Sequence, residues 1–235
     1  MDYATYVATL SNLTVTTATM PEFVQILPEC IDYAEQRLYR ELDLLNTVIR
    51  DSSATLTVGT RNFTLPTTLG RFVVTNGFNV ITPVSTTNPD NGTRNQLVPT
   101  TRDVLDIIWP STTGATVPQL YAMITDQQII VGPAPDAAYT IECIGTIRPN
   151  PLSASNTTTY LSLYLPSLLV AASMVFMSGY MKNFGAQADD PQMGASWESQ
   201  YGKLFTSANT EEMRKKYASG AWGSLQPTPI ATATR

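Results

Sequence analysis

One stretch near the N-terminus, Pro28 to Leu45, constrains the fold more than any other part of the sequence. Its apolar side chains recur at steps of three or four residues, which places them on one face of an α-helix. Pro28 suits the first turn of this helix, where the missing N–H of proline is not needed. Polar residues, Glu35 among them, take the remaining surface. Because such a stripe must be buried, the helix needs a partner; the stripe comprises Ile31, Ala34, Leu38, Leu42 and Leu45.

The best partner that the sequence offers lies far downstream, at Leu168 to Tyr180. It belongs to a stretch with no charged residue between Arg148 and Lys182. Pro166 interrupts this stretch and leaves about 16 helical residues, whereas a bilayer requires roughly 20. We therefore expect a buried core helix rather than a transmembrane span, and no membrane partner.

Between these two helices the apolar period changes to the alternation of β-strands. A Thr-capped short helix is expected at 101–109, with Val104, Leu105, Ile108 and Trp109 pointing inward. Residues 85–95 are rich in turn-forming residues and predict an exposed loop or hairpin tip. Strands are expected at 54–58, 61–65, 71–81, 119–125, 127–131 and 139–147.

We therefore predict an α+β fold, in which the N- and C-terminal segments form a helical bundle around an inserted antiparallel β-rich domain. Near the N-terminus, Thr19 should cap a short helix, and Pro28 should restart the chain as a helix at a new angle. A last helix is expected from Asp190 to about Tyr217. The predicted parts are the N-terminal helices 1–46, the β-rich insert 47–152, the C-terminal helices 153–218 and an extended arm 219–235.

The composition argues against most classes of enzyme and against tight binding to nucleic acid. The chain has no histidine, which removes the commonest general base and metal ligand. Its net charge of −5 argues against binding to nucleic-acid phosphates. Only 14% of its residues are charged, which favours a subunit buried in an assembly. The two cysteines, Cys30 and Cys143, have no CxxC partner and are predicted to be buried free thiols.

Few residues invite a catalytic or ligand-binding interpretation. Asp103 and Asp106 lie one helical turn apart, but without a third ligand a solvated helix face explains them better. The cations at 214–216 either contact phosphate or simply favour the C-terminal turn of their helix. No GxGxxG, P-loop or GxSxG pattern is present. We therefore assign no catalytic, cofactor-binding or metal-binding residue.

The C-terminal arm carries apolar residues on a segment that is too rich in proline and glycine to form its own helix. Trp222 is the predicted anchor to another subunit, with Leu225 and Ile230 as secondary contacts. A terminus that binds nothing is the alternative, and the sequence leaves it open.

Four segments in this order resemble the head-to-tail adaptor proteins of short-tailed bacteriophages. They are LPECIDYAEQRLYRELDLL, QQIIVGPAPDAAYTIECIGTIRPNPL, YLSLYLPSLLVAASMVFMSGYMKN and WESQYGKLF. The resemblance implies a ring of twelve subunits beneath the portal protein that attaches tail nozzle or fibre proteins. It implies that DNA passes through without specific binding, and that the protein is assembled in the host cytoplasm and resides in the virion neck.

Two other classes of protein remain as alternatives. The chain could be another structural subunit of the tail, such as a nozzle or fibre-attachment protein. Less favoured is a soluble enzyme that uses Asp or Ser in place of histidine. The mass of the oligomer distinguishes a ring subunit from an enzyme of this kind, because the ring subunit forms a large oligomer and the enzyme a small one.

Overall fold

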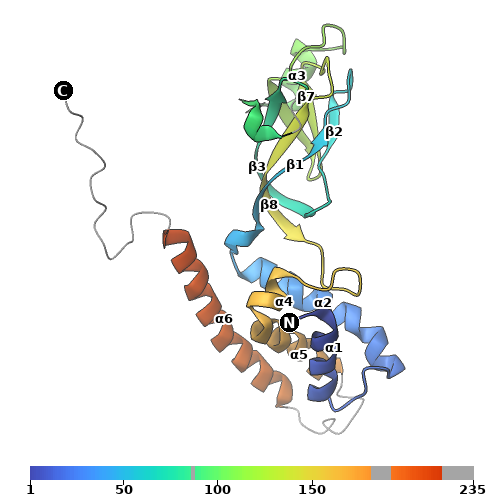
Figure 1. Ribbon diagram of the computed structural model, residues 1–235, viewed down its shortest axis with the longest axis vertical. Helices are drawn as coiled ribbons and strands as arrows, with labels where there is room; N and C mark the ends of the chain where they lie inside the picture. Colours follow the sequence, from blue (N-terminus) through green and yellow to red (C-terminus); the bar gives the residue numbers. More distant parts are fainter. Residues whose placement is uncertain (86–87, 181–191, 219–235) are drawn as a thin grey trace, which may run out of the picture. The chain divides into compact units, whose positions relative to one another are not determined.

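The computed structural model describes residues 1–85, 88–180 and 192–218 (Figure 1). It confirms the prediction of an α+β fold, with six α-helices and two β-sheets in these residues. The chain divides into two compact units. A helical unit comprises Met1–Leu45 and Pro151–Arg235, and a β unit comprises Asn46–Asn150.

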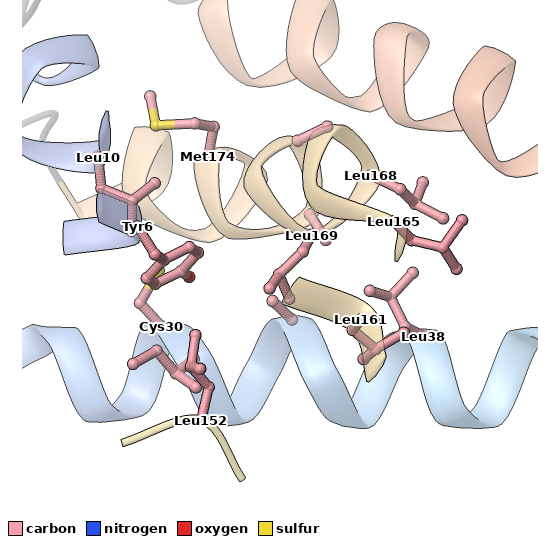
Figure 2. Close-up of a cluster of buried hydrophobic side chains, with 14 of the residues drawn as sticks. Tyr6, Leu10, Cys30, Leu38, Leu152, Leu161, Leu165, Leu168, Leu169 and Met174 are labelled. Carbon is pink, nitrogen blue, oxygen red and sulfur yellow. The ribbon is translucent and has the colours of Figure 1, made fainter. Parts of the chain in front are cut away.

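The helical unit is organised around α5, Pro166–Tyr180. This helix contacts α1, α2, α4 and α6, which explains why its sequence is apolar on nearly every side. Figure 2 shows α5 between α2 and α6, with Leu169 and Met174 among the buried side chains of the cluster. The other helices are α1 (Tyr3–Leu13), α2 (Pro21–Glu41), α4 (Tyr160–Tyr164) and α6 (Met193–Ala218).

The predicted contact between the N-terminal stripe and the distant apolar segment is confirmed. Helix α2 packs against α5, and Ile31, Leu38 and Leu42 share one buried cluster with Leu168 and Leu169. None of these five side chains is more than 4% exposed. Burial of apolar surface from both ends of the chain therefore holds the two segments of the helical unit together.

The expectation that Pro28 starts a new helix was wrong. Helix α2 runs continuously from Pro21 to Glu41 and contains Pro28 in its interior. Phe23 and Cys30, on either side of this proline, lie in the same buried cluster. Packing on both sides of Pro28 therefore offsets the backbone hydrogen bond that proline removes.

The predicted ends of this helix also differ from those observed. Met20 occupies the N-cap position without a side-chain hydrogen bond, so Thr19 is not the cap. At the other end Leu42 is the C-cap, and Leu45 begins a short 3₁₀ turn, Leu45–Thr47. The last residue of the predicted stripe therefore lies outside the helix.

The β unit contains two four-stranded sheets that share one core. Their strand orders are β1-β8-β3-β4 and β2-β7-β6-β5. Phe78 and Ile141 from the first sheet and Ile129 and Val131 from the second lie in a single buried cluster. The strands are β1 (Val48–Thr55), β2 (Asn62–Thr64), β3 (Gly70–Thr82), β4 (Thr93–Gln96), β5 (Val98–Pro99), β6 (Leu120–Thr125), β7 (Gln128–Gly132) and β8 (Thr140–Pro149).

The sheets differ from the predicted insert in two respects. Strand β5 pairs with β6 in parallel, whereas the other pairings are antiparallel, so the insert is not wholly antiparallel. Residues 93–95 of the predicted loop belong to β4, which pairs with the end of β3. The tip of this hairpin contains a 3₁₀ turn, Pro89–Asn91, and residues 86–87 lie outside the described ones. Polar edge strands of this kind lack the apolar alternation that reveals central strands.

Across residues 1–85, 88–180 and 192–218, no helix combines the length and the apolar character that crossing a bilayer requires.

Replacing Leu38 with alanine should destabilise the protein strongly, because this side chain is fully buried between α2 and its partners. We expect Leu38→Ala to lower the free energy of unfolding by about 2–5 kcal/mol, measured by urea denaturation. Val24→Ala on the same helix is the matched control, because Val24 is 51% exposed. A loss at Leu38 no larger than that at Val24 would contradict the packing described above.

Candidate functional site

The carboxylates that invited a catalytic interpretation are engaged in structural contacts or exposed. Asp106, on α3 (Arg102–Ile108), pairs with Arg61 at 3.2 Å and with Arg102 at 3.5 Å. Asp103, one turn earlier, is exposed to solvent. Within the described part of the chain, no group of three or more His, Cys, Asp or Glu residues could hold a metal ion.

Both cysteines are buried free thiols, as predicted. The Cys30 thiol donates a hydrogen bond to the Ser173 carbonyl oxygen at 3.5 Å, and Cys143 lies in β8 opposite Asp51. Burial raises the pKa of each thiol to about 12. Because the thiolate is the reactive form, neither cysteine suits nucleophilic chemistry at neutral pH.

The most extensive polar contacts of the helical unit hold the long helix α6. Near its start, the Arg37 guanidinium of α2 donates to both carboxylate oxygens of Glu198, at 2.8 and 2.5 Å. The same guanidinium lies 4.0 Å from the centre of the Tyr201 ring, and the Tyr201 hydroxyl donates to Glu41 at 2.5 Å. The ion pair with Glu198 raises the pKa of Arg37 above its usual value and lowers that of Glu198. A bidentate pair combined with cation–π stacking fixes the orientation of α6 at this end.

The other end of α6 is held through Glu212, which is only 2% exposed. Its carboxylate accepts hydrogen bonds from Lys215 Nζ at 2.7 Å, from the Tyr160 hydroxyl at 3.2 Å and from the Leu45 backbone N–H at 3.2 Å. Burial acts to raise the pKa of Glu212, but these hydrogen bonds outweigh it and leave the pKa below its usual value. The carboxylate is therefore ionised in the folded protein and links α6 to two other segments.

Ion pairs within the helical unit also account for two of the three cations near the end of α6. Lys215 pairs with Glu211 as well as with Glu212, and Lys216 pairs with Asp43. The i, i+4 spacing of Glu211 and Lys215 was readable in the sequence and favours this pairing over a phosphate contact. The long-range partner Asp43 had no sequence signal.

Helix α6 is thus fixed within the helical unit near its start and near its end. It ends at Ala218, immediately before the predicted arm 219–235. The predicted anchors Trp222, Leu225 and Ile230 lie outside the described residues. The structure therefore defines the point on the helical unit from which the arm departs.

The β unit carries an exposed apolar helix face that the sequence did not predict. Leu105 of α3 is fully buried against the second sheet, but Val104 and Ile108, expected to point inward, are 39% and 51% exposed. Ile107 is 78% exposed. The helix lies so close to β7 that a Cβ at Gly132 would come within 2.7 Å of Leu105 and Trp109. Exposed apolar residues on a closely packed helix are typical of contact surfaces in assemblies.

The helical unit has an apolar groove of its own, with a volume of about 540 Å³. It lies between the α1–α2 connection and the end of α5. Among the residues that line it are Val15, Met20, Phe23, Ile26, Met177 and Tyr180. This groove is a candidate surface for contacts with other subunits, and the exposed face of α3 in the β unit is a separate one.

Removing the Glu212 carboxylate should destabilise the helical unit. We expect Glu212→Ala to cost about 1–3 kcal/mol in urea denaturation, because it leaves the Leu45 N–H and the Tyr160 hydroxyl without their acceptor. Glu211→Ala is the control, since Glu211 also pairs with Lys215 but its side chain is 57% exposed. Equal effects of the two substitutions would show that the buried carboxylate does not hold α6.

Comparison with known proteins identifies the family, although no curated protein matches the chain. The model of the SU10 adaptor protein family matches residues 1–224. The match covers both units and reaches Trp222, whereas Leu225 and Ile230 lie beyond it. Both units carry exposed apolar surface, in keeping with a protein that acts through contacts. The chain belongs to the SU10 adaptor protein family, a family of phage head-to-tail adaptors.

Proposed function

We propose that this protein forms a closed ring beneath the portal protein, with twelve subunits as the resemblance implies. The ring connects the capsid to the tail, binds nozzle or fibre proteins on its tail side and lets DNA pass. Assembly takes place in the host cytoplasm, and the finished ring resides in the virion neck.

The observation that carries this proposal is the family match over residues 1–224. Membership makes the chain a structural component of the phage virion, and adaptors of this family associate with portal and tail proteins. The net charge of −5 supports passage of DNA without specific binding, because a surface that grips phosphates needs an excess of lysine and arginine.

Two features support an arm that binds outside its own unit. Pro227 and Pro229 oppose a helix in the arm and favour an extended chain, which can lie along a neighbour's groove or sheet edge. The contacts of Glu198 and Glu212 hold α6, so the arm departs from a fixed point. An anchored arm acts at a high effective concentration on a partner within its reach.

Deleting residues 219–235 should leave a folded protomer that no longer docks stably on the portal protein. The folded state is expected to survive, because all the described residues of the buried cluster in the helical unit lie before the arm. Circular dichroism checks the fold, and co-sedimentation with purified portal protein checks docking.

The single substitution Trp222→Ala should reproduce most of the loss of docking, because aromatic anchors dominate contacts of this kind. Ser224→Ala, two residues away, is the matched control and should dock like the unaltered protein. Docking that survives both the deletion and Trp222→Ala would show that the arm binds nothing at this interface.

A further inference from the structure

Two buried carboxylates hold the chain where it leaves and re-enters the helical unit. The first connection follows Leu45, whose backbone N–H donates to Glu212 of α6 at 3.2 Å. The second ends at Leu152, whose N–H donates to both oxygens of Glu35 of α2, at 3.2 and 3.3 Å. Glu35 is only 4% exposed, so the sequence-based expectation that it lies on the polar face of its helix was wrong.

The two carboxylates differ in their electrostatic surroundings. Glu212 receives a hydrogen bond from the Lys215 ammonium group. Glu35 is faced by Asp32 and Tyr39 of its own helix and by Tyr6 of α1, none of which is a cation. From the returning segment it is faced by the Leu152 N–H and by Thr159, a hydrogen-bond partner that does not titrate.

The environment therefore gives Glu35 little to compensate a negative charge. A buried carboxylate without a cationic partner is more stable in its protonated form. The neighbouring Tyr39 hydroxyl is itself buried without a hydrogen-bond partner among the described residues, so it does not neutralise the charge.

We propose that Glu35 is a proton-controlled latch for the chain segment that re-enters the helical unit. In its protonated form it stays buried and holds Leu152 against α2. When it loses its proton to water, the carboxylate favours an open state in which it is hydrated and the segment 151–159 is released from α2.

The pH range of the latch follows from the titration of Glu35. Burial raises its pKa from the ordinary 4.5 to about 7, against the opposing hydrogen bonds of Leu152 and Thr159. A raised carboxyl pKa contributes stability that is fully present below about pH 4.5 and is lost as the pH rises to about 7. The population of the open state should therefore grow by up to about tenfold per pH unit across this range and level off above it.

Hydrogen–deuterium exchange of the full-length protein tests the latch directly. Peptides covering 151–159 are followed between pH 5 and 8.5, and the rates are corrected for the intrinsic pH dependence of exchange. We expect protection at Leu152 to fall by roughly 40-fold between pH 5 and 7 and by only about twofold more up to pH 8.5. In Glu35→Gln, which keeps the shape and an acceptor oxygen but cannot ionise, protection should not depend on pH.

Glu29→Gln is the matched control, because Glu29 is an exposed acid on the same helix, and its profile should match the unaltered protein. If Glu35→Gln shows the same fall in protection as the unaltered protein, another group controls the segment and the proposal is wrong. If Glu35→Gln does not fold, the pH profile of exchange in the unaltered protein still tests the proposal. Protection that is constant between pH 5 and 7 would overturn the latch.

Discussion

The burial of α5 is the interaction on which the helical unit depends. This helix comes from the C-terminal half of the chain and α2 from the N-terminal end, and their shared cluster brings the two together. The apolar residues on several sides of α5 leave it no stable exposed face, so it must be enclosed by other helices. The residues between the two helices, Asn46–Asn150, form a unit with a core of its own.

Polar contacts then fix the rotation and position of helix α6, which apolar packing alone leaves free. Apolar burial is non-directional, whereas the bidentate pair of Arg37 with Glu198 and the three hydrogen bonds to Glu212 set the rotation and position of α6. Glu35 does the same for the segment that re-enters the helical unit, but without a cation. A connector needs defined positions for the parts that reach its neighbours, and these contacts define where the arm starts.

The sequence predicted features that depend on local periodicity. The stripe of α2, the uncharged core helix α5 and the α+β class all follow from regular spacing of apolar residues. The interior position of Pro28 was missed, because the packing on both sides that keeps α2 continuous is a tertiary effect. The burial of Glu35 could have been found, since it lies four residues after Ile31 and three before Leu38, within the stripe. Strand β4 and the exposed face of α3 had no such signal, because one is polar and the other is an apolar helix with an uncovered side.

We propose that the chain acts as a ring that connects two parts of a virion. Native mass spectrometry of the adaptor purified together with its portal protein tests this most directly. We expect a complex in which each portal ring carries a closed set of adaptor chains, twelve by resemblance. An adaptor that stays monomeric or forms only a small oligomer, with no portal protein bound, would contradict it.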